Sequence, residues 1–438
     1  MTSRRRMHLI AYLKTGPTAL HVGSWRHPEA TLDDIFEPSR YEDIARLLEA
    51  ARFDGCFYAD LLGLYDTHGG SFATYVQGAG QISFLDPMTV LPLMARVTRH
   101  LGLGVTLSTT LIPAYYLARM LASLDRLSGG RVAWNMLTSS TDLEAQNFGL
   151  DNIPPRELRY DHADEVVEAC CALWDGWQAD AFVLDKAKGI FADPSKVKYQ
   201  NYSGRWVKTR GPLSIPRSPQ DRPILMQAGA SERGRQFAAR WAELVFTMQY
   251  RKSDLLTFTK DIKRRVAERG RDPADCRILA ATSVVIGETE SIARERAAYI
   301  DALPDPEMHL ASSSSSLSVD LSKVVLDEKV VDASQGNQGV QGTRDRIDRI
   351  KEAEGMTFAQ VVKRNTQSPP IVGTPAMIAD RMQDFFESGA CDGFVITPNV
   401  FPQMYEQFCR AVVPELQRRG VFRREYAGTT LRENLRNP

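Results

Sequence analysis

Short apolar runs alternate along the chain with longer segments of helical spacing. The runs are rich in Val, Ile, Leu and aromatic residues, as is typical of strands buried on both faces. They predict strands over residues 7–13, 55–60, 101–109, 131–139, 223–230, 244–249, 277–287 and 392–400. The segments between them predict helices over residues 39–52, 87–100, 113–127, 157–176, 231–242, 253–269, 289–301 and 404–419.

Alternating strands and helices favour a parallel sheet, and eight of each match a closed (β/α)8 TIM barrel. We expect residues 1–438 to form one such domain. An open, doubly wound sheet is the competing architecture. That fold normally carries a glycine fingerprint, and the glycines of "GGSFATYVQGAG" (69–80) lack the strand–turn–helix spacing. The pattern therefore favours the barrel.

Three segments are longer than a barrel requires, and we expect them to be insertions on its C-terminal face. They cover about residues 61–86, 177–222 and 303–372. The last contains a serine run (312–316) and a helix-like stretch at 343–364. Long loops of this kind are usually lids or disordered segments. The serine run fits a lid or a solvated linker, and composition does not choose between them.

Composition excludes several classes of partner. The 438 residues carry 54 Lys or Arg and 54 Asp or Glu, which gives no electrostatic case for nucleic acid or an anionic membrane. No run of about 18 apolar residues predicts a membrane span. The start "MTSRRRMHLIAYLK" has too short an apolar run for a signal peptide. Six cysteines without a C-x-x-C motif indicate buried, reduced thiols and a cytoplasmic protein.

Polar side chains gather at the predicted strand ends, where a barrel builds its active site. Asp60 ends the second strand, Thr106 lies in the third, and Asn135 and Ser139 lie in the fourth. No matching cluster of ionisable groups accompanies them. His21 and His27 have no partner at ligand spacing, so we expect no metal site.

The stretch "QAGAS" (227–231) runs directly into a predicted helix. Ala230 and Ser231 would present backbone N–H groups at the helix N-terminus, which is a ready anion site. Arg159 and Tyr160, at the start of another helix, could reach the same phosphate. The turn could equally be an ordinary one capped by Ser231. A neutral mouth with one phosphate cradle suits a phosphorylated planar cofactor such as flavin mononucleotide (FMN).

Several long motifs together resemble one family over nearly the whole chain. They include "MHLIAYLKTGPTALHVGSWRHPEA", "FDGCFYADLLGL", "LSGGRVAWNMLTSS", "RYDHADEVVEACCALWDGW", "GPLSIPRSPQDRPILMQAGASERGRQFAARWAELVF" and the tail from "DGFVITPNVFP". They resemble the flavin-dependent two-component monooxygenases of the bacterial luciferase superfamily. The branch is that of the nitrilotriacetate monooxygenase large component and dibenzothiophene-sulfone monooxygenase.

This resemblance implies a luciferase-like barrel that receives reduced FMN (FMNH2) from a separate NAD(P)H:flavin reductase. It implies that O2 reacts as a flavin peroxide or hydroperoxide and that one oxygen atom goes to a small organic substrate. Cleavage of a C–S or C–N bond commonly follows, and relatives are homodimers or homotetramers. The alternatives are a deazaflavin-dependent dehydrogenase and a non-enzymatic flavin-binding protein on the same barrel.

The motif carry-over assigns roles to individual residues. It implies catalytic roles for Thr106 and Asn135, and cofactor contacts for Asp60, Thr106, Asn135, Ser139, Tyr160, Ala230 and Ser231. We also expect a catalytic role for His21 in moving one proton, although His21 lies two residues before Gly23 where some relatives place histidine directly before the glycine. We expect Trp25, Phe57 and Tyr65 to line the substrate pocket and Arg26 and His27 to brace their loop. Simple packing of His21 and Trp25 remains the alternative. A carboxylate-rich substrate would need cationic side chains near the barrel mouth, and the candidates are Arg26, Arg159, Arg210 and Arg217.

Overall fold

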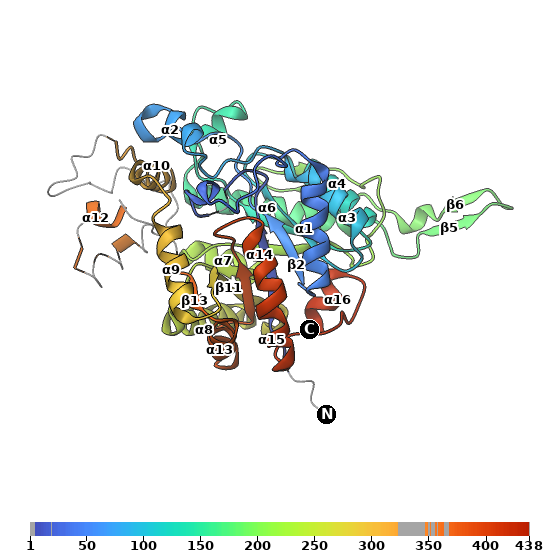
Figure 1. The fold of residues 1–438 in the computed structure, drawn as a ribbon. Helices are drawn as coiled ribbons and strands as arrows, with labels where there is room; N and C mark the ends of the chain where they lie inside the picture. Colours follow the sequence, from blue (N-terminus) through green and yellow to red (C-terminus); the bar gives the residue numbers. More distant parts are fainter. Residues whose placement is uncertain are drawn as a thin grey trace.

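Eight parallel strands close into a barrel in the computed structural model of the protein, which describes residues 5–18, 20–322, 347–348, 351, 355–356, 358–362 and 368–437 (Figure 1). The spatial order is β1-β2-β3-β4-β9-β10-β11-β14. These strands are β1 (His8–Leu13), β2 (Gly55–Tyr58), β3 (Gly102–Ser108), β4 (Val132–Leu137), β9 (Ile224–Gln227), β10 (Leu244–Thr247), β11 (Arg277–Thr282) and β14 (Gly393–Ile396). The expected (β/α)8 barrel is confirmed.

The barrel helices surround these strands (Figure 1). They are α1 (Pro38–Ala50), α3 (Pro87–Val97), α4 (Ala114–Leu127), α6 (Arg156–Trp174), α7 (Glu232–Trp241), α8 (Lys252–Glu268) and α13 (Pro375–Glu387), followed by α14 (Gln403–Gln407), a π-helical turn η6 (Phe408–Val412) and α15 (Val413–Arg418). Asp86 shows how the sequence starts such a helix, because its side chain accepts the Met88 N–H directly before Pro87.

The barrel interior is filled by apolar side chains. Tyr12, Phe57 and Phe246 form ring contacts there, with Phe57 centred 5.3 Å from Tyr12 and 5.5 Å from Phe246. A short C-terminal helix, α16 (Leu431–Arg436), adds Leu431 and Leu435 to the same cluster. A Cβ built at Gly102, the first residue of β3, would meet Leu431 at 2.6 Å. Helix α16 therefore packs at the amino ends of the strands.

Two predicted elements differ from the observed ones. The run 277–287 is two strands, because β12 (Val284–Ile286) leaves the barrel and pairs with β13 (Ile371–Gly373). The predicted helix 289–301 is α9 (Glu290–Asp301), but it lies between β12 and β13 and is not the barrel helix that precedes β14. That helix is α13, which the prediction omitted. The prediction of eight barrel helices was therefore right in number, but it included α9 in place of α13.

Smaller elements lie between the barrel elements. The segment after β1 holds η1 (Ser24–Arg26); the segment after β2 holds η2 (His68–Gly70) and α2 (Ala73–Gln77). The segment after β4 holds α5 (Asp142–Asn147), β5 (Phe182–Asp185), β6 (Ile190–Ala192), η3 (Pro194–Lys196), β7 (Tyr202–Ser203) and β8 (Lys208–Thr209). Later come η4 (Pro273–Asp275), α10 (Pro306–Leu317) and α12 (Phe358–Val362). The predicted helix-like stretch 343–364 lies largely outside the described residues.

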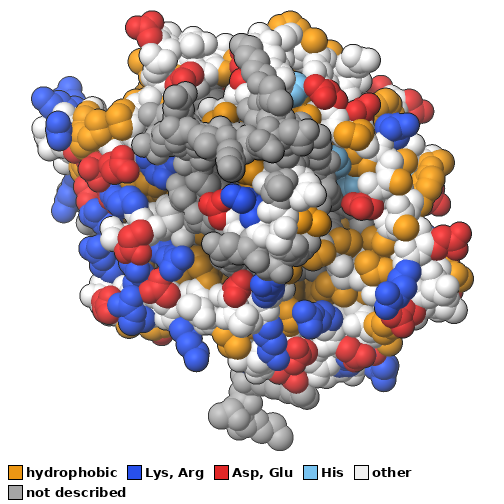
Figure 2. Space-filling view, turned by 90° about the vertical axis from the view of Figure 1, so that its left-hand side faces the viewer, with side chains coloured by type: hydrophobic (Ala, Val, Ile, Leu, Met, Phe, Trp, Pro, Cys, Tyr) orange, Lys and Arg blue, Asp and Glu red, His pale blue; other side chains and the backbone are white. Residues whose placement is uncertain are grey.

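The β5–β6 hairpin projects far from the body of the molecule, on the side opposite α9 and α10 (Figure 1). The side of α9 and α10 carries apolar, basic and acidic side chains interspersed around its rim (Figure 2). None of the helices in the described part of the chain combines the length and apolar character needed to span a membrane.

Candidate active site

Thr106 and Asn135 lie side by side near the carboxyl ends of β3 and β4. The two strands pair in a register that sets these residues opposite each other. The Asn135 side-chain amide donates to Thr106 Oγ1 at 2.9 Å, and both residues are buried. The structure thus joins two of the predicted site residues in one hydrogen-bonded pair at the barrel mouth.

Two neighbouring strands each carry a buried side-chain amide oxygen that accepts no hydrogen bond from another described residue. Asn135 Oδ1 on β4 and Gln227 Oε1 on the adjacent strand β9 have no hydrogen-bond partner within the described chain. An unsatisfied buried acceptor costs about 1–3 kcal/mol. Since native proteins seldom leave such groups unpaired, these oxygens are suited to accept hydrogen bonds from a bound ligand.

Ser139 follows β4 in a left-handed conformation (φ 49°). Its Oγ lies 3.0 Å from Ser108 Oγ and 3.3 Å from Glu144 Oε1. The Glu144 carboxylate is buried and also accepts from the Thr141 hydroxyl at 3.1 Å and the Ser140 N–H at 3.3 Å. This network holds the backbone after β4 in a conformation that is uncommon for a residue other than glycine.

Tyr160 and Ser231 meet at the N-terminus of α7. Ser231 caps this helix by accepting the Gly234 N–H at 3.1 Å, and its side chain is also hydrogen-bonded to the Tyr160 hydroxyl. Burial raises the pKa of Tyr160, and the contact with Ser231 opposes that shift. A Cβ at Gly234 would lie 2.9 Å from Tyr160 Oη, so the absence of a side chain there permits the approach.

The turn before α7 is similarly tight. A Cβ at Gly229 would lie 2.1 Å from Gln227 Nε2 and 3.3 Å from Tyr160 Oη. Ala230, between Gly229 and Ser231, has its carbonyl held by Arg235 Nε at 2.8 Å. The predicted phosphate residues Tyr160, Ala230 and Ser231 therefore come together at one helix N-terminus, beside the unpaired oxygen of Gln227.

Asp60 follows β2 and is mostly buried. Burial raises its pKa to about 6, although the nearby Ser83 side chain, the Leu61 N–H and the charge of Lys14 oppose the shift. The Leu61 N–H donates to Asp60 Oδ1 at 2.9 Å. Burial also lowers the pKa of Lys14 to about 8, against the attraction of Asp60. Two oppositely charged groups with shifted pKa values thus mark the ends of β1 and β2, a feature common at functional sites.

The loop after β1 brings His21 and Trp25 against two other segments. Trp25 Nε1 donates to the Gly78 carbonyl at 2.8 Å, and Arg26 donates to the Leu303 carbonyl at 2.5 Å. Neither ring nitrogen of His21 has a hydrogen-bond partner in another described residue. Burial lowers the pKa of His21 to about 4, with the charge of Asp301 opposing the shift. His21 is therefore a neutral imidazole at physiological pH.

Phe57 and Tyr65 occupy different surroundings. Phe57 is packed inside the barrel with Tyr12 and Phe246, as described above. The Tyr65 ring lies 5.1 Å from the Tyr75 ring, and burial raises the pKa of Tyr65 well above its usual value. Substrate contact by Phe57, Tyr65 and Trp25 stays a prediction.

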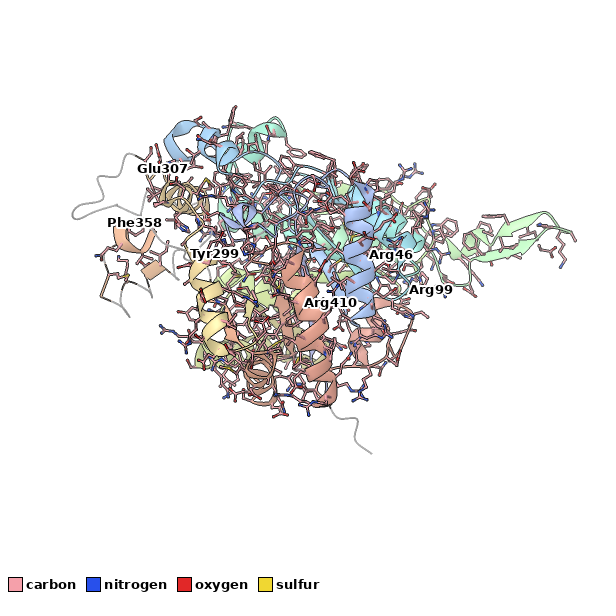
Figure 3. All side chains as sticks on the ribbon, viewed as in Figure 1. Arg46, Arg99, Tyr299, Glu307, Phe358 and Arg410 are labelled. Atoms are coloured by element: carbon pink, nitrogen blue, oxygen red, sulfur yellow. The ribbon has the colours of Figure 1, made fainter. Side chains whose placement is uncertain are left out.

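The serine run is part of a buried helix. It lies in α10, where Ser313, Ser314 and Ser315 are at most 5% exposed. His68 connects this helix to the segment after β2: its Nδ1 lies 3.2 Å from Ser314 Oγ and its Nε2 2.6 Å from Glu307 Oε1 (Figure 3 labels Glu307). The Tyr75 hydroxyl is hydrogen-bonded to Ser315. The interpretation of the run as a solvated linker is therefore wrong, because these serines lie in a buried helix. Their short hydroxyl side chains let α10 pack closely against its neighbours.

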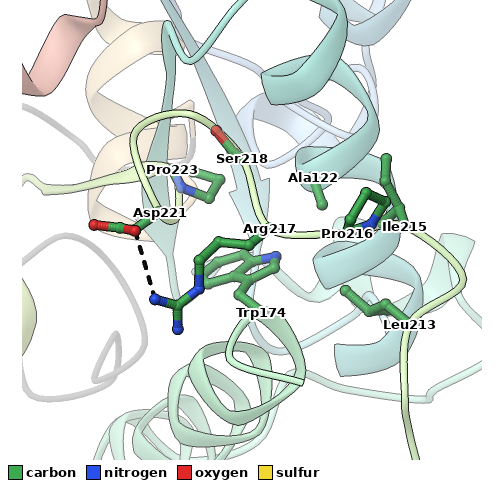
Figure 4. A pocket seen from close by; sticks show the side chains of 9 residues that line it. All are labelled: Ala122, Trp174, Leu213, Ile215, Pro216, Arg217, Ser218, Asp221 and Pro223. Atoms are coloured by element: carbon green, nitrogen blue, oxygen red, sulfur yellow. Dashed lines mark hydrogen bonds and ion pairs between the residues drawn. The ribbon is translucent and has the colours of Figure 1, made fainter. Parts of the chain in front are cut away.

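The candidate cations differ in their surroundings. Arg159 is buried and donates to the Pro154 carbonyl at 3.0 Å, and Arg210 lies over the Tyr199 ring at 4.4 Å. Arg217 pairs with Asp175 and Asp221. It lines a small hollow between α4, the last residue of α6 and the 213–223 segment (Figure 4). These two ion pairs already occupy the Arg217 guanidinium, and substrate contact by any of these arginines stays a prediction.

All six cysteines are buried and unbonded, as the sequence predicted, and burial raises the pKa of each thiol. Across the described ranges, no three His, Cys, Asp or Glu side chains are grouped so as to hold a metal ion.

Sequence reasoning missed Gln227 and Glu144 as individual site residues. The signal for Glu144 was present, since "TDLE" (141–144) is a capping-box pattern that ties a carboxylate to the turn containing Ser139. Gln227 carried no comparable signal, because only the closed barrel shows that its side chain is buried without a donor.

The fold and these residues define a class of protein. The family model of the luciferase-like monooxygenases matches residues 18–392, and the chain belongs to that family. The dibenzothiophene-sulfone monooxygenase of Rhodococcus erythropolis (strain XP) is 42% identical over 442 residues, covering 99% of this chain and 97% of its own. Nitrilotriacetate monooxygenase component A of Aminobacter aminovorans is 36% identical over 425 residues, covering 95% and 94%.

The structural comparison agrees. A riboflavin lyase solved with modified FMN and its substrate riboflavin has a TM-score of 0.91 and 30% identity, covering 99% of this chain and 96% of its own. The resemblance inferred from the sequence motifs is confirmed, branch included. Since relatives of 36–42% identity over nearly the full chain are named monooxygenases, this chain is a monooxygenase.

Proposed function

We propose that this protein is the large component of a two-component monooxygenase that uses reduced FMN and O2. A separate NAD(P)H:flavin reductase would supply the reduced flavin, as the "component A" in the name of one relative suggests. The substrate would be a small organosulfur compound or an aminopolycarboxylate, with C–S or C–N cleavage after oxygenation. A cytoplasmic location and a homodimer or homotetramer complete the proposal.

One observation carries the proposal. The unpaired buried amide oxygens of Asn135 on β4 and Gln227 on β9 lie close to the N-terminus of α7, which Ser231 caps. A flavin ring offers N–H donors and a phosphate tail, so the residues fit it. Asn135 and Gln227 would accept from the ring, with Thr106 fixing the Asn135 amide. Tyr160, Ala230 and Ser231 would hold the phosphate, where the helix dipole favours negative charge. The bound reduced flavin supplies the oxygen chemistry.

The protein's own groups would then orient the reactants and exclude water. The Asn135 amide, whose nitrogen is held by Thr106, would keep its oxygen aimed at a ring N–H and so hold the flavin in a fixed orientation. The network around Ser139 and Glu144 keeps the loop after β4 in place. Burial lowers the pKa of His21 to about 4, so its imidazole is neutral near pH 7. A neutral His21 can accept a proton from the substrate, and it can return that proton in a later step.

Oxygen uptake by the reconstituted system tests the proposal. The purified chain, a flavin reductase, NAD(P)H and FMN are mixed with aryl sulfones, S-substituted cysteines or aminopolycarboxylates, and product is measured under 18O2. We expect substrate-dependent product that contains one labelled oxygen atom. Product formed without O2 in a parallel mixture that contains an oxidised deazaflavin as hydride acceptor would instead support the deazaflavin-type dehydrogenase, and no product from any class would contradict the substrate assignment.

A further test concerns His21. Its substitution, His21→Ala, is expected to lower turnover or substrate affinity at an unchanged melting temperature. Unchanged turnover and affinity would show that His21 only packs in its loop.

A further inference from the structure

The β5–β6 hairpin forms an arm, residues 181–198, that reaches away from the barrel (Figure 1). Its apolar side chains are open to solvent: Leu184 is 60% and Phe191 67% exposed, and Val183 and Ile190 are also exposed. An isolated two-stranded hairpin is marginal in water, and monomeric proteins seldom expose contiguous apolar surface without a function. The arm therefore has the character of half an interface.

The arm is anchored to the body at its root. The rings of Trp177 and Phe182 lie 5.8 Å apart, and Phe182 and Phe191 lie 5.3 Å apart. The Trp177 indole donates to the Leu213 carbonyl at 2.7 Å. An aromatic row with its base fixed and its outer members exposed can present apolar surface to a partner at a low entropic cost.

A second exposed apolar surface lies just before α1 and α3. Phe36 is 66% and Phe84 46% exposed, and their rings lie 5.6 Å apart, with Leu32 also exposed. We call these three residues the Phe36 patch. The segment around it, residues 27–39, holds the carboxylates Glu29, Asp33, Asp34 and Glu37 and no Lys or Arg. Asp34 is paired with Arg40, which follows the segment, so Glu29, Asp33 and Glu37 carry the acidic charge of the rim. The patch is therefore apolar with an acidic rim.

The arm has the opposite charge. Residues 181–198 contain four lysines and two aspartates: Lys186, Lys188, Lys196, Lys198, Asp185 and Asp193. Lys196 pairs with Asp180 at the root of the arm and Lys188 with Asp185 at 3.5 Å, so the arm keeps a positive net charge. Lys186 and Lys188 are exposed at the turn between β5 and β6. Matching apolar centres with opposite charges at the rim are the features that select a partner and fix its orientation.

We propose that the arm of one copy docks on the Phe36 patch of a second copy, so that two copies exchange arms about a two-fold axis. The arm and the patch lie at different places on the same chain. When each copy binds the patch of the other, both surfaces are used and the assembly is a closed dimer.

A cysteine pair tests this contact directly. The native cysteines are all buried, so wild-type protein gives no background cross-link. We expect the double variant Phe36→Cys/Phe191→Cys of the full chain to form a covalent dimer under mild oxidation, seen on non-reducing gels, while each single variant does not. A cross-link in Phe191→Cys alone would mean arm-to-arm contact, and no cross-link in the double variant would overturn the proposal.

Charge exchange provides a second, independent test by sedimentation. Lys186→Glu/Lys188→Glu and Asp33→Lys/Glu37→Lys should each weaken dimerisation about threefold to tenfold, and the combination should restore it. Phe191→Ser should raise the dimer dissociation constant about ten- to hundredfold. Ile292→Ser, an exposed change on α9 opposite the arm, serves as the control and should leave it unchanged.

The result that overturns the proposal is equally plain. A wild-type chain that sediments as a monomer, or a dimer that neither set of variants affects, rules out arm exchange. If the arm variants instead lose activity only when a flavin reductase supplies the flavin, the arm binds the reductase and the proposal fails.

Discussion

Polar side chains at the two ends of the barrel differ in how they are paired, although some atoms at the amino end, among them Arg423 Nε and Nη1, also lack a partner in the described chain. At the amino end, Asp54 accepts hydrogen bonds from His8 Nδ1 and the Leu9 N–H, both at 2.8 Å, and pairs with Arg423. Arg131 there donates from all three of its nitrogens, to one hydroxyl and four backbone carbonyls. At the carboxyl end, the oxygens of Asn135 and Gln227 have no donor among the described residues.

An unpaired atom alone therefore does not mark a ligand site, and what distinguishes the mouth is two open acceptors on adjacent strands beside a helix N-terminus. Asp54 is fully buried, and burial would raise its pKa, yet the charges of Arg423 and His8 hold that pKa below its usual value. Such a carboxylate is matched by protein alone. The amide oxygens at the mouth are matched only if something else binds. The comparison predicts that substitutions at one end change stability and those at the other change activity.

The largest expected effect is on folding. Asp54→Ala leaves Arg423 buried without its carboxylate, and breaking a buried pair costs about 3–5 kcal/mol. Urea denaturation followed by circular dichroism measures the loss. Asp43→Ala, at an exposed position on α1, is the control and should leave the midpoint nearly unchanged. A similar small change for Asp54→Ala would contradict the structural role of this end.

Asn135→Ala tests the other end. We expect coupled substrate oxygenation to fall about 10²-fold, since the variant loses the acceptor that orients the flavin ring and a small misplacement of the reactants costs that much. Stability should change far less, because the variant also removes an acceptor that the protein leaves unpaired. Product formed per O2 consumed measures the first effect and thermal melting the second. Equal losses of both would remove the distinction between the two ends.

The barrel could be predicted because its signal is repeated. Each strand of the barrel is an apolar run, and burial on both faces requires such runs wherever they occur. The identity of the eighth helix was missed although Thr374 and Pro375 mark its start, because α9 already filled the count. Local patterns show that a helix forms, but they do not show which sheet it covers.

The site was predictable to the extent that it follows strand ends. Thr106 and Asn135 meet because neighbouring parallel strands bring equivalent positions together, and Tyr160 meets Ser231 as the motif resemblance implied. The burial of the serine run in α10 was not predictable, since hydroxyl-rich composition also fits a linker. Unpaired oxygens such as that of Gln227 depend on long-range packing and leave no local pattern.

A smaller effect should appear in the dependence of stability on pH. The pKa of Asp60 is raised from 3.8 to about 6 in the folded protein, so folding favours its neutral form. Its contribution to stability is present below pH 3.8 and is lost as the pH rises through about 6. Between pH 4 and 7, wild type should lose about 2–3 kcal/mol relative to Asp60→Asn.

The opposite slope from His21, whose pKa is lowered, is common to both proteins and cancels in that difference. Asp43→Asn should run parallel to wild type as a control for the substitution. Denaturation midpoints at half-unit pH steps measure the curves. Parallel curves for wild type and Asp60→Asn would show that folding does not favour the protonated, neutral form of the Asp60 carboxyl group.

The smallest effect separates the phosphate from the ring. Tyr160→Phe removes one hydroxyl at the N-terminus of α7 while keeping the ring that packs 5.6 Å from Phe237. One hydrogen bond to a phosphate is worth about 1.5 kcal/mol, so the dissociation constant of FMN should rise about tenfold. Riboflavin, which lacks the phosphate, should bind both proteins equally under anaerobic fluorescence titration. If both flavins weaken together, Tyr160 supports the ring or the fold, and the anion site at this end of the barrel lies elsewhere.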